Sequence, residues 1–147
     1  LEIKRLSGML KQMPRLGWIL GFCAMASLGL PGLAGFWGEF PAILSAYKPA
    51  AGLPEETFRT FMVVAALGTV LAAGYLLWLY QRTAFGEINP EFAPGHGHDD
   101  DIHDVNKFEW VAWTPLLVAI VVFGVYPQLM FKVLDPAVSA TLKAFGG

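Results

Sequence analysis

The sequence predicts an all-α membrane protein with three transmembrane crossings, the first of them a discontinuous helix, and a short amphipathic helix after the last. Composition is the first indication, because the 147 residues are 55% hydrophobic and 15% charged, whereas soluble domains carry about 25% charged residues. The second is that three long runs, 16–47, 61–81 and 111–130, contain Glu39 as their single ionised side chain. Each run reaches the roughly 20 apolar residues that cross a bilayer. A soluble bundle of very apolar helices is the alternative.

The length of the first apolar run predicts that it is interrupted. As one straight helix, its 32 residues would extend about 48 Å. That is too long for one crossing of a hydrocarbon core about 30 Å thick, and two crossings need about 40 residues. Pro31 and Gly32 resolve this conflict, because Pro31 has no amide to donate to the Ser27 carbonyl and Gly32 allows the chain to bend.

We therefore expect two half-helices, about 16–29 and 33–47, that together make one discontinuous crossing. Within the second half-helix, Pro41 removes another backbone hydrogen bond, the one to the Trp37 carbonyl. Irregular backbone at membrane depth is tolerated where protein or a water-filled cavity receives the freed polar groups. A proline kink without a function is the alternative interpretation.

Glu39 is the acid that this interrupted run places at membrane depth. A carboxylate at the bilayer centre costs about 2.5–3.5 kcal/mol on insertion scales, so we expect it to face the protein interior and to mark a functional site. At 100° per residue, its two flanks differ in side-chain size. Small residues lie on one flank and large ones on the other: Gly35, Ala42 and Ala46 against Phe36, Phe40, Ile43 and Tyr47. The candidate hinge and channel-lining residues around Glu39 are Ser27, Pro31, Gly32, Gly35 and Trp37.

The other elements follow from hydropathy and from helix start signals. The expected order is a cytoplasmic or interfacial segment at 1–15, the broken helix at 16–47, transmembrane helices at 59–82 and 106–129 separated by a polar loop at 83–105, and an amphipathic surface helix at 134–145. Asp135 and Pro136 predict the start of that last helix. The distribution of Lys and Arg favours a cytoplasmic N-terminal segment. Because the chain begins at Leu1 without a signal-peptide pattern, we expect a C-terminal piece of a longer membrane protein.

Three further features argue against other classes of function. The loop at 83–105 contains His96, His98, His103 and four aspartates, but their spacing fits no compact tetrahedral site, so a solvated connector is favoured over a metal site. The single cysteine, Cys23, excludes an intrachain disulfide and is interpreted as a packing residue. A net charge of −2 without a basic patch argues against a nucleic-acid partner.

Several stretches resemble one family of membrane proteins. Gly29-Leu-Pro-Gly-Leu-Ala-Gly-Phe-Trp-Gly-Glu39-Phe40 closely resembles the hallmark stretch of the antiporter-like subunits of respiratory complex I, the proton-pumping NADH:quinone oxidoreductase. Tyr80-Gln-Arg-Thr-Ala-Phe-Gly86 resembles the end of the family's following helix, and Asp104, Glu109 and Gly124-Val-Tyr-Pro127 also fit. A glutamate rather than a lysine at position 39 points to the branch of the family called subunit M.

The resemblance implies a fold and an activity. The chain would correspond to the last three of fourteen transmembrane helices, with the twelfth broken, in a family built on inverted repeats. Glu39 matches the residue that passes protons toward the outer face. The chain would be a non-redox subunit of the enzyme without a cofactor or metal of its own, with NADH, FMN, iron–sulfur clusters and quinone bound elsewhere in the complex. Its partners would be the sibling antiporter-like subunits and the lipid bilayer, in a bacterial plasma membrane rather than a mitochondrial inner membrane.

Two alternatives remain open from the sequence. One is a subunit of a related cation/proton antiporter of the Mrp-like type, which would share the broken helix. The other is a structural or metal-binding membrane protein, in which Glu39 would be a satisfied buried acid and the histidine-containing loop the active part.

Overall fold

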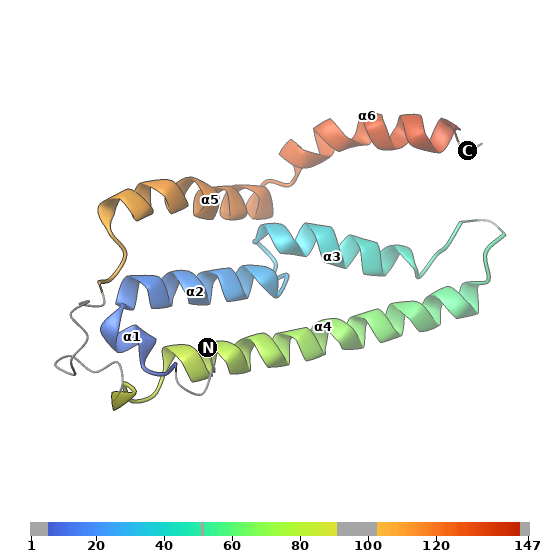
Figure 1. Cartoon of the computed structure of the whole chain (residues 1–147). Coiled ribbons are helices and arrows are strands. Elements are labelled where there is room, and N and C mark those ends of the chain that lie inside the picture. The colour runs from blue at the N-terminus through green and yellow to red at the C-terminus, as the bar shows by residue number, and fades with distance from the viewer. Residues whose placement is uncertain (1–5, 51, 91–102, 145–147) are drawn as a thin grey trace.

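A computed structural model of the chain describes residues 6–50, 52–90 and 103–144. This described part is all-helical and contains no strand. Its helices are α1 (Met9–Gln12), α2 (Pro14–Ser27), α3 (Ala34–Ser45), α4 (Glu55–Ala84), α5 (Lys107–Val125) and α6 (Gln128–Ala144). In Figure 1, α2 and α3 follow one another in the same direction, α4 runs back beside both, and α5 returns before α6 continues onward. The predicted all-α class is confirmed.

Two helices of the described part, α4 and α5, are long and apolar enough to cross a membrane. Glu55 and Glu56 lie in the first turn of α4 and Arg82 in its last, so these charges oppose the partial charges of the helix ends. α5 begins with a capping box formed by Asn106 and Glu109. In that box the Glu109 carboxylate accepts a hydrogen bond from the Asn106 amide at 2.8 Å, which satisfies one of the donors at the helix start.

The long helices differ in extent from the ranges expected from hydropathy. The expected crossing at 59–82 falls inside α4, and the one expected at 106–129 extends beyond α5, which ends at Val125. The Tyr126 amide still donates to the Val122 carbonyl at 2.8 Å. Pro127 then has no amide to continue the pattern, which explains why α5 stops there.

The C-terminal helix begins earlier than expected. Asp135 is not its N-cap, because α6 starts at Gln128 and runs through Pro136 without ending. The amides of Met130 and Phe131 donate to the Pro127 carbonyl at 2.9 and 3.1 Å. Pro127 is therefore the proline at the helix start, where its missing amide costs little, while Pro136 removes one internal hydrogen bond from α6.

Polar contacts tie the chain together at one end, where the residues before α1 meet those after α4. The Ser7 hydroxyl donates to the Glu87 carbonyl at 2.6 Å, and the Gly8 amide donates to the Phe85 carbonyl at 3.2 Å. The buried side chains of the described part also lie at this end: Thr83, Ala84 and Val105. The rest of the structure is held mainly by helices that approach closely at glycines.

α2 packs closely against α4 and α1 at two of its glycines. A Cβ added at Gly21 would lie 2.6 Å from the hydroxyl of Tyr80 in α4. A Cβ added at Gly17 would lie 2.8 Å from the side chain of Leu10 in α1. Small residues at such contacts let helices pack closely where lipid tails give no hydrophobic drive for association.

Candidate functional site

The separation of α2 from α3 creates the irregular backbone around which the candidate site is built. α2 ends at Ser27 and α3 begins at Ala34. Between them, Gly29 and Gly32 have positive φ angles of 64° and 95°, a conformation that glycine adopts at little cost. The Leu33 amide donates to the Leu30 carbonyl at 3.0 Å, so the connection is a tight turn and not an extended linker.

Glu39 lies on the second turn of α3 and its carboxylate reaches back to this turn. A Cβ added at Gly29 would lie 3.2 Å from Glu39 Oε2, as expected because helical side chains lean toward the N-terminus. Within the described residues, no hydrogen bond or ion pair reaches the carboxylate. The side chain is exposed in this chain, so these helices alone do not supply the protein interior that we expected around it.

Gly35 shares the face of α3 that carries Glu39, since the two are four residues apart. A Cβ added at Gly35 would lie 2.5 Å from the Ala26 carbonyl oxygen and 3.6 Å from the Gly29 Cα. The absence of a side chain therefore allows α3 to approach the last turn of α2. Gly29, Gly35 and Glu39 meet at the break, where Ser27 and Pro31 are exposed.

Trp37 points in another direction and joins α3 to α5. Its indole Nε1 donates to the Gly124 carbonyl at 2.7 Å. That carbonyl belongs to the last turn of α5, whose carbonyl groups lack a partner within the helix. The Trp37 ring also meets the edge of Phe131 in α6, with ring centroids 6.0 Å apart.

Gly124 is a site residue that the search for chemistry-bearing side chains missed. A Cβ added there would collide with the backbone of Gly32 and Leu33. The end of α5 thus packs directly against the backbone of the turn between α2 and α3. A glycine near the end of an apolar helix was the available signal, but its contact partners, Gly32 and Leu33, lie far away in the sequence and could not be predicted from spacing.

Asp104 fixes the opposite end of α2. Its carboxylate accepts from the amides of Arg15 at 3.0 Å, Leu16 at 3.1 Å and Val105 at 2.8 Å, and the Arg15 guanidinium donates to the Val105 carbonyl at 3.1 Å. Burial by itself raises the pKa of Asp104, but the three amide hydrogen bonds and the Arg15 charge outweigh it, so the pKa lies below its ordinary value. The residues before α5 therefore cap the first turn of α2.

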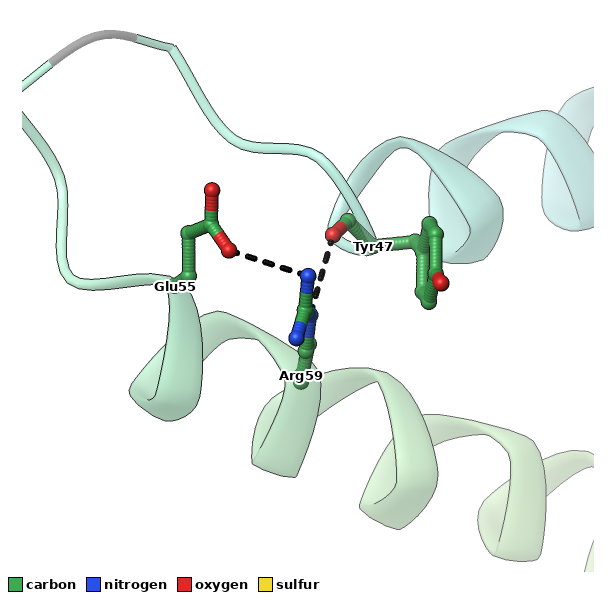
Figure 2. Close-up of polar contacts among 3 residues, drawn as sticks. All are labelled: Tyr47, Glu55 and Arg59. Carbon is green, nitrogen blue, oxygen red and sulfur yellow. Dashed lines mark hydrogen bonds and ion pairs between the residues drawn. The ribbon is translucent and has the colours of Figure 1, made fainter.

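Figure 2 shows Arg59 at the connection between α3 and α4. Its guanidinium pairs with Glu55 at 2.9 Å and lies 5.0 Å from the centroid of the Tyr47 ring. Nε of Arg59 also donates to the Tyr47 carbonyl at 3.5 Å. Because the Arg59 and Glu55 side chains are 48% and 59% exposed, we expect this contact to contribute little to stability.

An apolar groove of about 660 Å³ lies between α2 and α5. Its walls include Trp18 and Ile19 of α2 and Leu117 and Val118 of α5. Glu39 is not among its lining residues. The groove is therefore separate from the site at the break.

Of the histidine-containing loop, the structure describes only the two ends. His96 and His98 lie outside the described residues, and His103 is exposed. In the ranges 6–50, 52–90 and 103–144, no three or more His, Cys, Asp or Glu side chains are grouped so that they could hold a metal ion.

Comparison with known proteins supports the same family resemblance as the motif around Glu39. The chain is 33% identical over 139 residues to NADH-quinone oxidoreductase subunit M of Rhodobacter capsulatus, which covers 94% of the chain and 24% of that protein. It is 34% identical over 142 residues to subunit M of Mycobacterium tuberculosis (strain CDC 1551 / Oshkosh), covering 95% of the chain and 22% of the relative. The chain resembles a C-terminal portion of subunit M.

A relative named as a chain of NADH-ubiquinone oxidoreductase is similar to nearly the same degree. NADH-ubiquinone oxidoreductase chain 4 of Marchantia polymorpha is 32% identical over 139 residues, which is 93% of the chain and 25% of that protein. No family model matches the chain. The chain spans about a quarter of the length of the curated relatives it matches. The resemblance to subunit M inferred from the motif around Glu39 is confirmed.

Proposed function

We propose that this chain forms the last part of a proton-translocating subunit in the membrane arm of NADH:quinone oxidoreductase, with Glu39 relaying protons toward the outer side. The observation that carries the proposal is the placement of Glu39. It is an acid without a partner among the described residues, it lies beside Gly29 at a helix break, and it occurs in a chain that resembles subunit M.

In this proposal, α2 and α3 together form one discontinuous crossing, α4 the second and α5 the third. With 14 and 12 residues, α2 and α3 would extend about 21 and 18 Å, so each is too short to cross a core of about 30 Å. Their common direction in Figure 1 supports treating them as one crossing. The amphipathic α6 would then lie along the membrane surface or on a partner.

The break supplies backbone groups that a proton path can use. No side chain caps the first amides of α3, and prolines at 31 and 41 leave the carbonyls of Ser27 and Trp37 without their helical donors. Water molecules held by such groups can deliver a proton to the Glu39 carboxylate. Glu39 then passes the proton on when a neighbouring charge moves, since a carboxylate holds its proton according to the charges and hydrogen bonds around it.

We propose no redox centre in this chain. Iron–sulfur clusters need several thiolate ligands, and the sequence contains the single cysteine Cys23. NADH, FMN, iron–sulfur clusters and quinone would act in other subunits, and the sibling antiporter-like subunits would be the direct partners in a bacterial plasma membrane.

The test is Glu39→Gln in the complete enzyme, assayed in inside-out membrane vesicles. Glutamine keeps the size of the side chain but cannot ionise, so NADH-driven acidification should be abolished or sharply reduced while the subunit still assembles. Acidification is followed with a pH-sensitive dye, and NADH oxidation is measured separately. Glu56→Gln, at the exposed start of α4, is the matched control and should pump like the wild type. Full pumping by Glu39→Gln would overturn the proposal.

Purification of the complex separates this function from that of a related antiporter. A subunit of the oxidoreductase should copurify with subunits that carry flavin and iron–sulfur clusters, detected by their absorption spectra. A complex that pumps cations but carries neither chromophore would favour the antiporter.

A further inference from the structure

α5 and the residues just before it hold both half-helices of the break. At one end, Asp104 accepts from the first amides of α2 at 3.0 and 3.1 Å. At the other end, the Gly124 carbonyl accepts from Trp37 of α3 at 2.7 Å. The segment from Asp104 to Gly124 therefore links the first turn of α2 to the first turn of α3.

The bond from Trp37 differs in kind from the other contacts of α3. Among the described residues, it is the one side-chain hydrogen bond that joins α3 to a distant part of the chain; the Ser45 hydroxyl bonds within the helix, to Ala42. The remaining contacts of α3 are ring contacts and close backbone approaches, such as that of Gly35 to the Ala26 carbonyl. Apolar contacts are non-directional, whereas a hydrogen bond prefers a narrow range of angles.

That bond fixes the rotation of α3 about its own axis. Trp37 and Glu39 are two residues apart, which places them about 200° apart around a helix. While Trp37 is held against Gly124 on α5, Glu39 is turned away from α5 and toward Gly29, where a Cβ would lie 3.2 Å from its Oε2. The turn at the break has positive φ angles at Gly29 and Gly32, a conformation that glycine adopts at little cost.

We propose that Trp37 is a positioning residue whose hydrogen bond to the Gly124 carbonyl holds the Glu39 carboxylate at the break. The effect of Trp37 on proton transfer rests on the proposed function, because a Glu39 carboxylate that leaves the break loses its proton path. The geometric claim, that Trp37 sets where the Glu39 carboxylate lies, can be tested without measuring proton pumping.

The test compares carbodiimide labelling of Glu39 in the assembled enzyme, in native membranes, between wild type and Trp37→Phe. Phenylalanine keeps an aromatic ring but cannot donate the hydrogen bond. Loss of one hydrogen bond corresponds to about a fivefold shift in an equilibrium between orientations, so we expect the labelling rate at Glu39 to change about fivefold. Dicyclohexylcarbodiimide is the probe, mass spectrometry of the peptide containing position 39 is the readout, and Glu39→Gln gives the unlabelled baseline.

Trp18→Phe is the matched control. Trp18 is 71% exposed on α2 and lines the groove that is separate from the site at the break. It should label like the wild type. Trp37→His keeps a ring N–H donor and should return the rate toward the wild-type value, which a purely space-filling role would not do. An unchanged rate in Trp37→Phe, or no rescue by Trp37→His, would overturn the proposal.

The outcomes for the two proposals are distinguishable. If Glu39→Gln pumps normally while Trp37→Phe changes labelling, the relay function fails and the positioning role stands. If Glu39→Gln abolishes pumping while labelling in Trp37→Phe is unchanged, the relay stands and the positioning role fails.

Discussion

The first turn of α2 and the break after its last turn are both held by α5 and the residues that precede it, but by different interactions. At the first turn, one carboxylate, Asp104, accepts three amide hydrogen bonds. At the break, one indole donates to one carbonyl, and the remaining contact is backbone against backbone at Gly124.

The two regions differ because they contain different polar groups that need hydrogen-bond partners. The start of a helix has amides without partners, so a neighbouring carboxylate stabilises it through charge-assisted hydrogen bonds. At the break, Glu39 lies beside backbone but accepts no hydrogen bond from the described residues. A carboxylate that accepts three amide hydrogen bonds, as Asp104 does, has a lowered pKa and therefore stays ionised at neutral pH. The fold thus satisfies Asp104 and leaves Glu39 without a hydrogen-bond partner among the described residues, which is what the proposed relay requires.

Gly124→Ala should break this arrangement with the largest effect. The added methyl group would collide with the backbone of Gly32 and Leu33, which cannot move aside as a side chain can. We expect a loss of about 1–3 kcal/mol, the usual cost of overpacking, measured as a lower thermal midpoint of the solubilised complex and less assembled subunit. Gly74→Ala in α4 is the control, because open space surrounds that position. Equal stability of the two variants would contradict the backbone contact.

Asp104→Asn should have a smaller and more local effect. Asparagine keeps one acceptor oxygen but loses the charge, and loss of a helix cap costs about 1 kcal/mol. We expect faster hydrogen exchange at the amides of Arg15 and Leu16 in the assembled complex, read by mass spectrometry. Asp135→Asn on the exposed α6 is the control, and unchanged protection of the first turn of α2 would refute the cap.

The same carboxylate predicts a pH dependence with a defined sign. Because the pKa of folded Asp104 lies below its ordinary value of 3.8, its contribution to stability is fully present above pH 3.8. The contribution is lost as the pH falls through the lowered pKa, where the folded form takes up its proton. The difference in protection between wild type and Asp104→Asn should therefore persist at neutral pH and disappear in strong acid. A difference that grows on acidification would contradict this sign.

Arg59→Ala should have the smallest effect. Its ion pair with Glu55 is exposed on both sides, and such pairs contribute about 0–1 kcal/mol. The cation–π contact with Tyr47 adds about 0.5–1 kcal/mol at an exposed site. We expect a small decrease in the thermal midpoint, partly restored in Arg59→Lys, which keeps the charge. A loss as large as that of Gly124→Ala would show that the connection between α3 and α4 is structurally more important than its exposure indicates.

Local chemistry explains which parts of the fold could be predicted. Apolar runs without charge predicted helices at 59–82 and 106–129, which overlap α4 and α5, and Pro31 and Gly32 indicated where the chain departs from a helix. The start of α6 was predicted at Asp135 because Asp-Pro is a typical helix start. The structure uses Pro127 instead, since the proline nearer the end of α5 interrupts the backbone pattern first.

Only part of the candidate site could be predicted, because some of its residues are recognised by their type and others only by distant contacts. Glu39 could be recognised from sequence because an acid in an apolar run is costly. Gly35 was selected for its small size beside that acid, and a Cβ there would approach the Ala26 carbonyl. Gly124 and the cap from Asp104 could not be predicted, because residues 87–89 positions apart had to be brought together first.

The sequence by itself determined the helical class, the resemblance to subunit M, and the acid at the break, since each depends on residue type and short-range spacing. The tertiary structure decided the orientation of that acid. It turned Trp37 toward α5 and Glu39 toward Gly29, because the end of α5 lacks a hydrogen-bond donor that Trp37 supplies, and because Gly124 has no side chain and lets its backbone meet that of Gly32 and Leu33.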